Sequence, residues 1–262
     1  MGDDGRRRTR LSPGSPLRLG GRTAYPPPVA NPPGDPSAAV RRPRRGATLV
    51  LGLASLANGA ALVLHIVAGL PLPLLLTVIW IVAVLSIVGI ATVGGPSTRA
   101  SIVRVAVVGL AVGIGATLAY DATKAVLSQL DPSPFDPFEA TRVFGRILVG
   151  EGAAPWAIAT SGWAFHLANG STFAVAYAAL FARDGRVSRR RGIIAGVGWA
   201  LLLETFQLIL YPGWLDIRFL DEFRQISFLS HVVYGVGLGV FVPAALRRAR
   251  LRSNHKTGVI NG

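Results

Sequence analysis

The chain has 262 residues, of which 51% are hydrophobic and only 15% charged, and its mean hydropathy is +0.47. Soluble domains carry about a quarter charged residues, so this composition excludes an ordinary soluble enzyme. The charge is also one-sided, with 27 Lys and Arg against 13 Asp and Glu, which is typical of a multi-spanning membrane protein with basic ends. Because there is no cysteine, disulfides, thiolate catalysis and Cys-ligated metal centres are excluded.

Residues 1–46 form a basic, proline-rich segment. They include ten arginines and half of the chain's 18 prolines, with no long apolar run. Such a composition cannot bury enough apolar surface to offset its ordering entropy, so we predict a disordered cytoplasmic tail. The basic clusters here and in the C-terminal tail, 248–262, predict contacts with anionic lipid headgroups. Nucleic-acid binding is not favoured, since Tyr25 is the only aromatic residue of the N-terminal tail.

Six apolar stretches follow, each long enough to cross a bilayer, which takes about 20 residues. We therefore predict an all-α polytopic membrane protein, with a bundle of six transmembrane helices in residues 47–247. The predicted spans are 48–69, 72–94, 102–122, 157–181, 192–211 and 226–246.

The distribution of basic residues predicts the orientation. If the N-terminus is cytoplasmic, the inner segments hold 22 Lys and Arg and the outer segments hold five. Cytoplasmic loops are the ones enriched in these residues. We expect a multi-pass protein of the plasma (inner) membrane with both termini in the cytoplasm. A bacterial origin is favoured by the use of 25 arginines against two lysines, which fits a GC-rich genome.

The longest predicted outer loop, 123–156, contains a helix start. Asp136 is suited to cap a helix, Pro137 to occupy its first position, and Glu139 to sit in its first turn. The apolar residues that follow share one side over 137–149. We predict a short interfacial helix, which either lies on the outer membrane surface or covers the bundle as a lid.

Ionisable side chains occur inside the predicted spans at His65, His166, Glu204 and His231. Such groups are costly at membrane depth, so each is a candidate for a functional site that faces the bundle or a water-filled cavity. From the helical rise of about 1.5 Å per residue, all four lie in the outer half of the membrane, as does Asp121 at the end of the third span. This convergence predicts one polar region that is reachable from outside.

Small residues spaced four apart accompany these polar residues. Gly192, Gly196 and Ala200 precede Glu204 on one stripe, and His231 begins another. Small stripes allow membrane helices to approach closely. We expect the last three spans to pack on one another with their polar residues in the contact.

The candidate set follows from these positions, and it favours binding or transport of a small solute, a proton or a cation. The candidate ligand- or proton-binding residues are His166, Asn169, Glu204, Gln207, His231 and Tyr234, with His65 and Asp121 as secondary candidates.

Two alternatives stay open. In the first, the same residues only hydrogen-bond the helices together, and the protein is structural or accessory, acting as a homo-oligomer or with a membrane protein partner. In the second, His166, Glu204 and His231 hold a metal ion in a membrane enzyme. An enzyme is the less favoured role, because the sequence contains no Gly-x-Ser-x-Gly elbow and no phosphate-binding glycine loop. No cofactor is identified.

The last three predicted spans resemble the YagU-like group of bacterial inner-membrane proteins. The matching features are His166, Phe173–Ala174, Tyr177, Arg191–Gly192, Tyr211–Pro212, Ser230–His231 and Tyr234–Gly235. This resemblance implies a membrane location and no defined activity. A second set is similar to the VanZ-like membrane proteins, which usually carry an Asn in the last helix where this chain has His231 or Tyr234. That set is Asn169, Phe173, Glu204 with Gln207, and Arg218 with Asp221.

Overall fold

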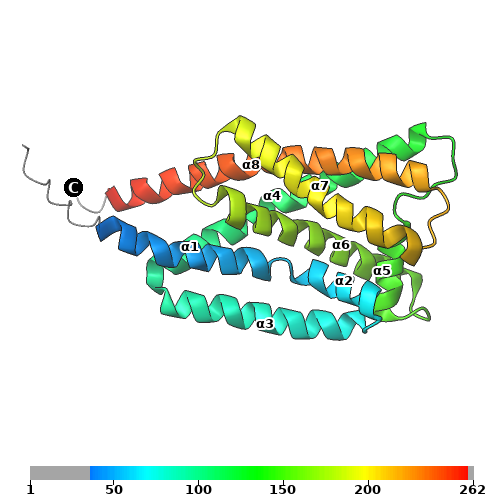
Figure 1. The fold of residues 1–262 in the computed structure, drawn as a ribbon, viewed down its shortest axis with the longest axis horizontal. Helices are drawn as coiled ribbons and strands as arrows, with labels where there is room; N and C mark the ends of the chain where they lie inside the picture. The colour runs from blue at the N-terminus through cyan, green and yellow to red at the C-terminus, as the bar shows by residue number, and fades with distance from the viewer. Residues whose placement is uncertain (1–35, 259–262) are drawn as a thin grey trace, which may run out of the picture. The chain divides into compact units, whose positions relative to one another are not determined.

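The structure, a computed structural model, describes the backbone of residues 36–258 and the side chains of residues 45–252. Within these residues every regular element is helical, which confirms the predicted all-α class (Figure 1). In chain order the elements are α1 (Pro36–Ala54), α2 (Ala57–Ala68), α3 (Leu72–Val93), α4 (Gly95–Leu130), α5 (Glu139–Val149), α6 (Pro155–Tyr177), the π-helix η1 (Ala178–Ala182), α7 (Arg189–Trp214) and α8 (Leu220–Gly258).

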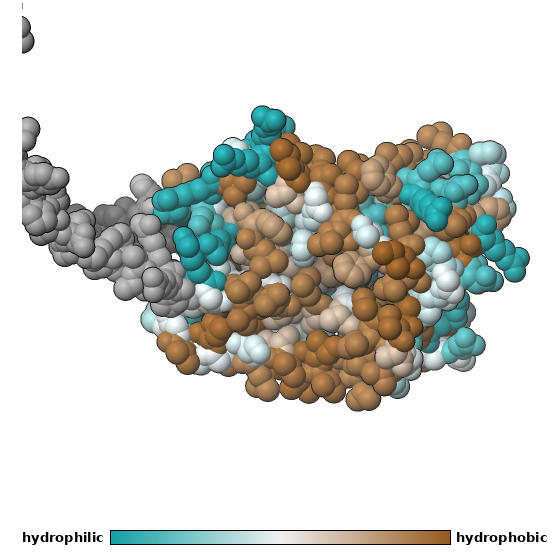
Figure 2. All heavy atoms as spheres, viewed as in Figure 1, coloured by the Kyte–Doolittle hydropathy of each residue, from teal (hydrophilic) through white to brown (hydrophobic). Residues whose placement is uncertain are grey.

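Several of these helices are long and apolar enough to cross a membrane. Four meet this condition alone, namely α3, α4, α7 and residues Leu220–Arg252 of α8. The bent pair α1 and α2 makes a fifth when it is counted as one span. Figure 2 shows that hydrophobic residues cover the middle of the face in view, whereas hydrophilic residues gather toward its two ends. Length and composition thus support four membrane-spanning helices, or five if the bent pair is one span.

The first predicted span, 48–69, is broken. A bend of 41° separates α1 from α2. At the break the Ser55 hydroxyl donates to the carbonyl oxygen of Leu51 at 2.7 Å, a type of side-chain bond that bends helices. Beyond it, Asn58 accepts a hydrogen bond from the Trp80 indole at 2.7 Å, which ties α2 to α3.

Three helices extend beyond the predicted boundaries. Helix α4 continues to Leu130 rather than ending at 122, so Lys124 lies on the same helix as Asp121. Helix α1 begins at Pro36, inside the predicted N-terminal tail, and α8 continues to Gly258, inside the predicted C-terminal one. The remainder of both tails, 1–35 and 259–262, lies outside the described residues.

Glycines bring α7 and α8 into backbone contact. A Cβ atom on Gly196 would lie 2.2 Å from the carbonyl oxygen of Gly235, and one on Gly192 would lie 2.4 Å from that of Gly239. The expected close contact between the small stripes of these two helices is therefore confirmed. Helix α8 also packs on α4, and α4 packs on α6.

The packing expected for the fourth predicted span is only partly right. Helix α6 lies against α4 and α5, and along the described residues it makes no extensive backbone contact with α7 or α8. Long aromatic side chains bridge the gap instead. They donate hydrogen bonds from Tyr177 to the Gly192 oxygen (2.9 Å), from Trp199 to the Phe173 oxygen (3.2 Å) and from Tyr234 to the Gly170 oxygen (2.6 Å).

Helix α5 is fixed to α6 by two more close approaches. A Cβ atom on Gly145 would lie 2.0 Å from the Ile158 oxygen, and one on Gly162 would lie 2.0 Å from the Thr141 oxygen. The Asp136 side chain accepts from the backbone N–H of Phe138 at 2.8 Å, just before the helix begins at residue 139. Helix α5 therefore packs directly on the outer part of the bundle.

Candidate functional site

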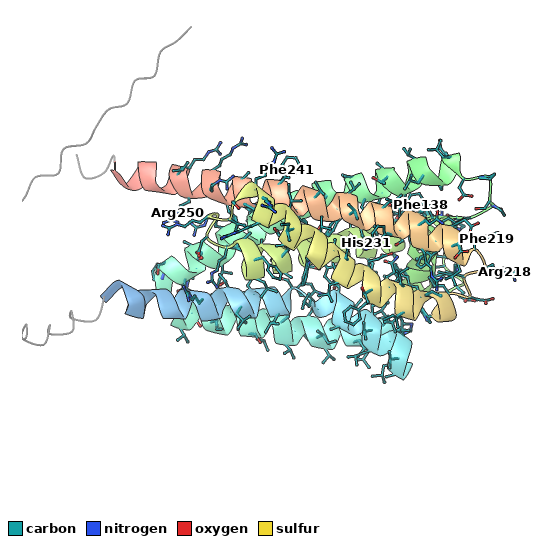
Figure 3. All side chains as sticks on the ribbon, turned by 45° about the horizontal axis from the view of Figure 1, so that its top comes forward. Phe138, Arg218, Phe219, His231, Phe241 and Arg250 are labelled. Carbon is teal, nitrogen blue, oxygen red and sulfur yellow. The ribbon has the colours of Figure 1, made fainter. Side chains whose placement is uncertain are left out.

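A cavity of about 950 Å³ lies among α2, α4, α5, α6, α7 and α8. The loops 131–138 and 215–219 supply its rim at the end of the bundle that the sequence predicts to face outward. Figure 3 shows Phe138, Arg218 and Phe219 at this end of the bundle and Arg250 toward the other, with His231 between them. The volume of the cavity is at the upper end of the range of about 300–1,000 Å³ that is usual for small-molecule sites.

The first polar group in the wall is the pair of His231 and Glu204. The Nδ1 atom of His231 lies 2.6 Å from Glu204 Oε2 and 3.0 Å from the Ser227 carbonyl oxygen. Since both partners accept, Nδ1 carries a proton and donates to them. Glu204 is only 1% exposed, so its carboxylate lies behind His231 rather than in the cavity wall.

Two further side chains hold Glu204 in place. The Ser227 hydroxyl donates to Glu204 Oε2 at 2.9 Å, and the Gln207 amide donates to that hydroxyl, also at 2.9 Å. Gln207 itself lines the cavity. The buried carboxylate of Glu204 is therefore connected to the cavity wall in two ways, directly through His231 and through Ser227 to Gln207.

The second polar group is the pair of His166 and Asp121. Nε2 of His166 lies 2.8 Å from Oδ1 of Asp121, which is 8% exposed. The other carboxylate oxygen, Oδ2, and the amide oxygen of Asn169 have no hydrogen-bond partner among the described residues, although both side chains line the cavity. Unsatisfied buried acceptors cost about 1–3 kcal/mol each, so this wall carries polar atoms whose hydrogen bonds are not met by the described residues.

Tyr120 lies between the two pairs. Its ring centroid is 4.8 Å from that of His231 and 6.0 Å from that of His166. The ammonium of Lys124, one turn further along α4, lies 5.2 Å from the Tyr120 ring and 5.9 Å from the ring of Phe138. Both contacts are within the range of cation–π attraction. Helix α4 thus contributes an aromatic ring and a buried cation to the centre of the site.

Asp136 and Arg142 form an ion pair at the outer rim. Partial burial favours the neutral form of Asp136. Hydrogen bonds from Arg142 and from the Phe138 N–H, together with the charges of Arg142 and Lys124, oppose this and hold the pKa of Asp136 below its usual value. Asp136 is therefore a carboxylate whose charge is already engaged.

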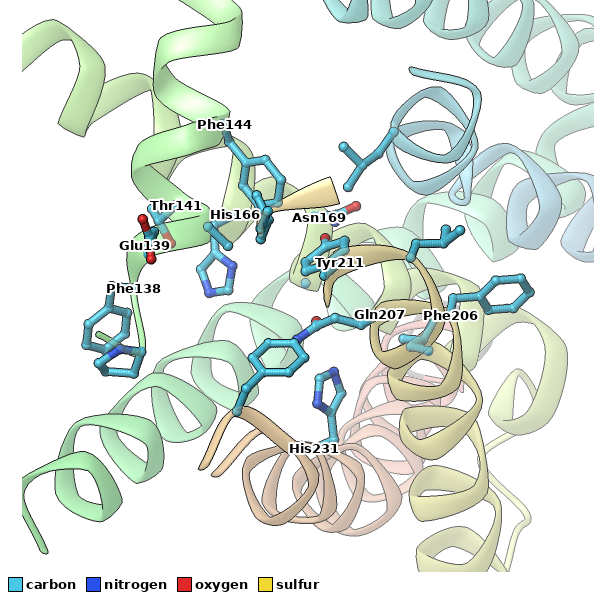
Figure 4. A pocket seen from close by; sticks show the side chains of 18 of the residues that line it. Phe138, Glu139, Thr141, Phe144, His166, Asn169, Phe206, Gln207, Tyr211 and His231 are labelled. Carbon is cyan, nitrogen blue, oxygen red and sulfur yellow. The ribbon is translucent and has the colours of Figure 1, made fainter. Parts of the chain in front are cut away.

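Not all of the predicted candidate residues line the cavity. Asp121 and Tyr234 line the cavity together with His166, Asn169, Gln207 and His231, the four that are labelled in Figure 4. Glu204 lies behind His231. The hydroxyl of Tyr234 is already used in the bond to Gly170. His65 lies elsewhere, since its Nδ1 donates to the Leu70 oxygen at 2.7 Å and its ring meets Trp214 edge-on.

Three residues of the site were not among the predicted candidates, namely Tyr120, Lys124 and Ser227. Ser227 lies four residues before His231, and Lys124 lies three residues after Asp121, so each shares a helix face with a predicted residue. The spacing of four residues from His231 was enough to predict that Ser227 lies on the same helix face. The same argument for Lys124 applies only if α4 continues beyond residue 122, which the sequence did not indicate.

The three residues proposed as metal ligands do not form one group. His166 contacts Asp121, whereas His231 contacts Glu204, because Tyr120 of α4 lies between the two histidines. Among the side chains that the structure describes, in residues 45–252, no cluster of three or more His, Asp or Glu is placed to hold a metal ion. The arrangement gives no support to the metal-dependent enzyme.

Comparison with protein-family models, with curated proteins and with solved structures finds no match for this chain. The resemblances to the YagU-like and VanZ-like groups therefore stay predictions, and the function is argued below from the site alone.

Proposed function

We propose that the chain is an integral protein of the bacterial plasma membrane with six crossings and both termini in the cytoplasm. The α1–α2 pair forms the first crossing and α6 the fourth. At about 1.5 Å per residue the 23 residues of α6 span roughly 35 Å, enough for the hydrocarbon core. Its polar side chains are accommodated because α4 and α5 cover it, and the excess of basic residues in the inner segments supports the orientation.

Single cysteines on either side of α6 test this topology in a chain that has no natural cysteine. Glu151 and Asp184 are exposed, and α6 with η1 is the regular structure between them. We expect a membrane-impermeant maleimide to label Glu151→Cys in intact cells and Asp184→Cys only after the membrane is permeabilised. Labelling of both from the same side would show that α6 does not cross.

We infer that the protein binds a small polar solute, a proton or a cation that enters the cavity from the outer side. The observation that carries this inference is that two histidine–carboxylate pairs lie along one cavity. His166, His231 and Asp121 line the cavity directly, and one oxygen each of Asp121 and Asn169 lacks a hydrogen-bond partner among the described residues. These groups supply both hydrogen-bonding and protonation chemistry to a bound solute.

The competing function is a structural membrane protein without a ligand. It is favoured by the hydrogen bonds that Tyr234 and Trp199 make between helices. Under that alternative, each polar residue of the cavity contributes to stability in the same way as these two.

Asn169→Ala and Tyr234→Phe separate the two functions. The Asn169 oxygen has no partner in the described residues, so Asn169→Ala deletes no hydrogen bond there and should not lower the free energy of unfolding. Tyr234→Phe deletes a hydrogen bond of 2.6 Å and should cost about 1 kcal/mol. Both values are measurable by unfolding in mixed detergent with tryptophan fluorescence. Equal losses for the two variants would favour the structural protein.

A further inference from the structure

The cavity continues from its polar end into an apolar arm. One wall of the arm is α2, with Ala60 and Val63, and the other is α7, with Leu203 and Phe206, while Phe173 of α6 lines the arm between them. The walls do not close on each other, because α2 packs mainly on α3 and α7 mainly on α8. Figure 4 shows Gln207 of α7 directed toward the space between His166 and His231, whereas Phe206, the preceding residue, is directed away from them.

Side chains at the rim of the arm are exposed although they line the cavity. Leu64 of α2 is 42% exposed, and Leu202 and Phe206 of α7 are 50% and 52% exposed. Both helices belong to the candidate membrane spans. The arm therefore opens sideways between α2 and α7, at a place where the proposed topology puts lipid chains.

The polar end presents a buried cation that lacks an ion-pair partner. Lys124 is 7% exposed and lines the cavity, and it forms no salt bridge with any described residue. The nearby carboxylates are engaged elsewhere, Asp121 with His166 and Asp136 with Arg142. Asp121, Glu204 and Asp136 interact with the Lys124 ammonium by longer-range electrostatic attraction, without direct contact. A buried ammonium in this position is suited to an anionic group, which would also accept its hydrogen bonds.

We propose that the ligand is a phospholipid, whose phosphate contacts Lys124 and one of whose hydrocarbon chains occupies the arm between α2 and α7. This proposal goes beyond the proposed function, because it gives the same cavity an amphiphilic ligand that enters sideways from the membrane. A phosphate matches the ammonium of Lys124, which has no ion-pair partner among the described residues. At the rim the positive charge of the exposed Arg218 is offset by the exposed Glu139 and Asp216, so Lys124 is the residue that would recognise the phosphate. A hydrocarbon chain matches the apolar arm.

Delipidated full-length protein, titrated with dioleoyl phosphatidylglycerol and followed by native mass spectrometry, tests this proposal. Wild type is compared with Lys124→Met and with Val63→Trp, which fills the arm. The matched control is Val67→Trp on the same helix, where the side chain is 69% exposed and lies outside the cavity. We expect affinity to fall about tenfold or more in the first two variants and to stay unchanged in the control.

A wild-type comparison makes the test independent of variant folding. Dioleoylglycerol, which lacks the phosphate, should bind at least about tenfold more weakly than the phospholipid. Equal binding of the two lipids, or equal binding by Val63→Trp and Val67→Trp, would overturn the proposal and indicate ordinary annular lipid. A second experiment separates the two proposals, namely the reaction of Asn169→Cys with a polar, membrane-impermeant thiol reagent in intact cells. If the lipid tests fail while that cysteine reacts, the cavity binds a water-soluble solute and the proposed function survives. If both fail, so does the proposed function.

Discussion

Gly196→Val is expected to lower the free energy of unfolding by about 3 kcal/mol. Even a single Cβ atom at this position would lie 2.2 Å from the Gly235 oxygen and 2.8 Å from the Gly239 nitrogen, so α7 and α8 must move apart. Both obstacles are backbone atoms, which cannot rotate away as a side chain can. Separation of these helices also disturbs the pair of Glu204 and His231, which joins them. Unfolding in mixed detergent, followed by tryptophan fluorescence, measures the loss.

Gly198→Val is the matched control on the same helix. Gly198 is exposed, and a Cβ atom there meets nothing within 4 Å. The two substitutions change helix propensity alike, so their difference reports the contact with α8. Similar melting of the two variants would show that α7 and α8 are not in backbone contact.

His231→Leu is expected to cost about 3–5 kcal/mol of stability, since it leaves a buried carboxylate without its partner. Glu204 is 1% exposed, and its Oε1 already lacks a hydrogen-bond partner among the described residues. Loss of the 2.6 Å contact at Oε2 leaves the Ser227 hydroxyl as the one hydrogen-bond donor to the carboxylate among the described residues. Detergent unfolding again gives the free energy.

The double variant His231→Leu with Glu204→Gln provides the control. The neutral amide removes the uncompensated charge and still offers an oxygen to the Ser227 hydroxyl, so part of the lost stability should return. If the double variant is instead as unstable as the sum of its single substitutions, the two residues are not coupled.

The sequence was sufficient for features that depend on local periodicity and composition. Apolar runs of about 20 residues predicted helices, and glycines spaced four apart predicted the close packing of α7 on α8. Helical rise brings His166 and His231 to a similar depth, and both side chains line the same cavity, while the prediction that this region binds a ligand stays a prediction.

What the sequence could not supply was the lateral order of the helices. Nothing in the spacing of His166 and Glu204 indicates that α4 lies between them, so the pairing of His166 with Asp121 was not predicted. The break at Ser55 was likewise missed, since the apolar run continues through it and the bend depends on a side-chain hydrogen bond. Both features are set by tertiary contacts rather than by local pattern.

The most direct test of the proposed site is the reaction of Asn169→Cys with a cationic, membrane-impermeant methanethiosulfonate applied to intact cells. Ala179→Cys, in the 1% exposed core of η1, serves as the unreactive control in the same cysteine-free background. An outward-facing polar cavity predicts that the first thiol reacts and the second does not. If the cysteine at 169 reacts only after denaturation, the polar residues are packing groups and the cavity is not a site open to the outside.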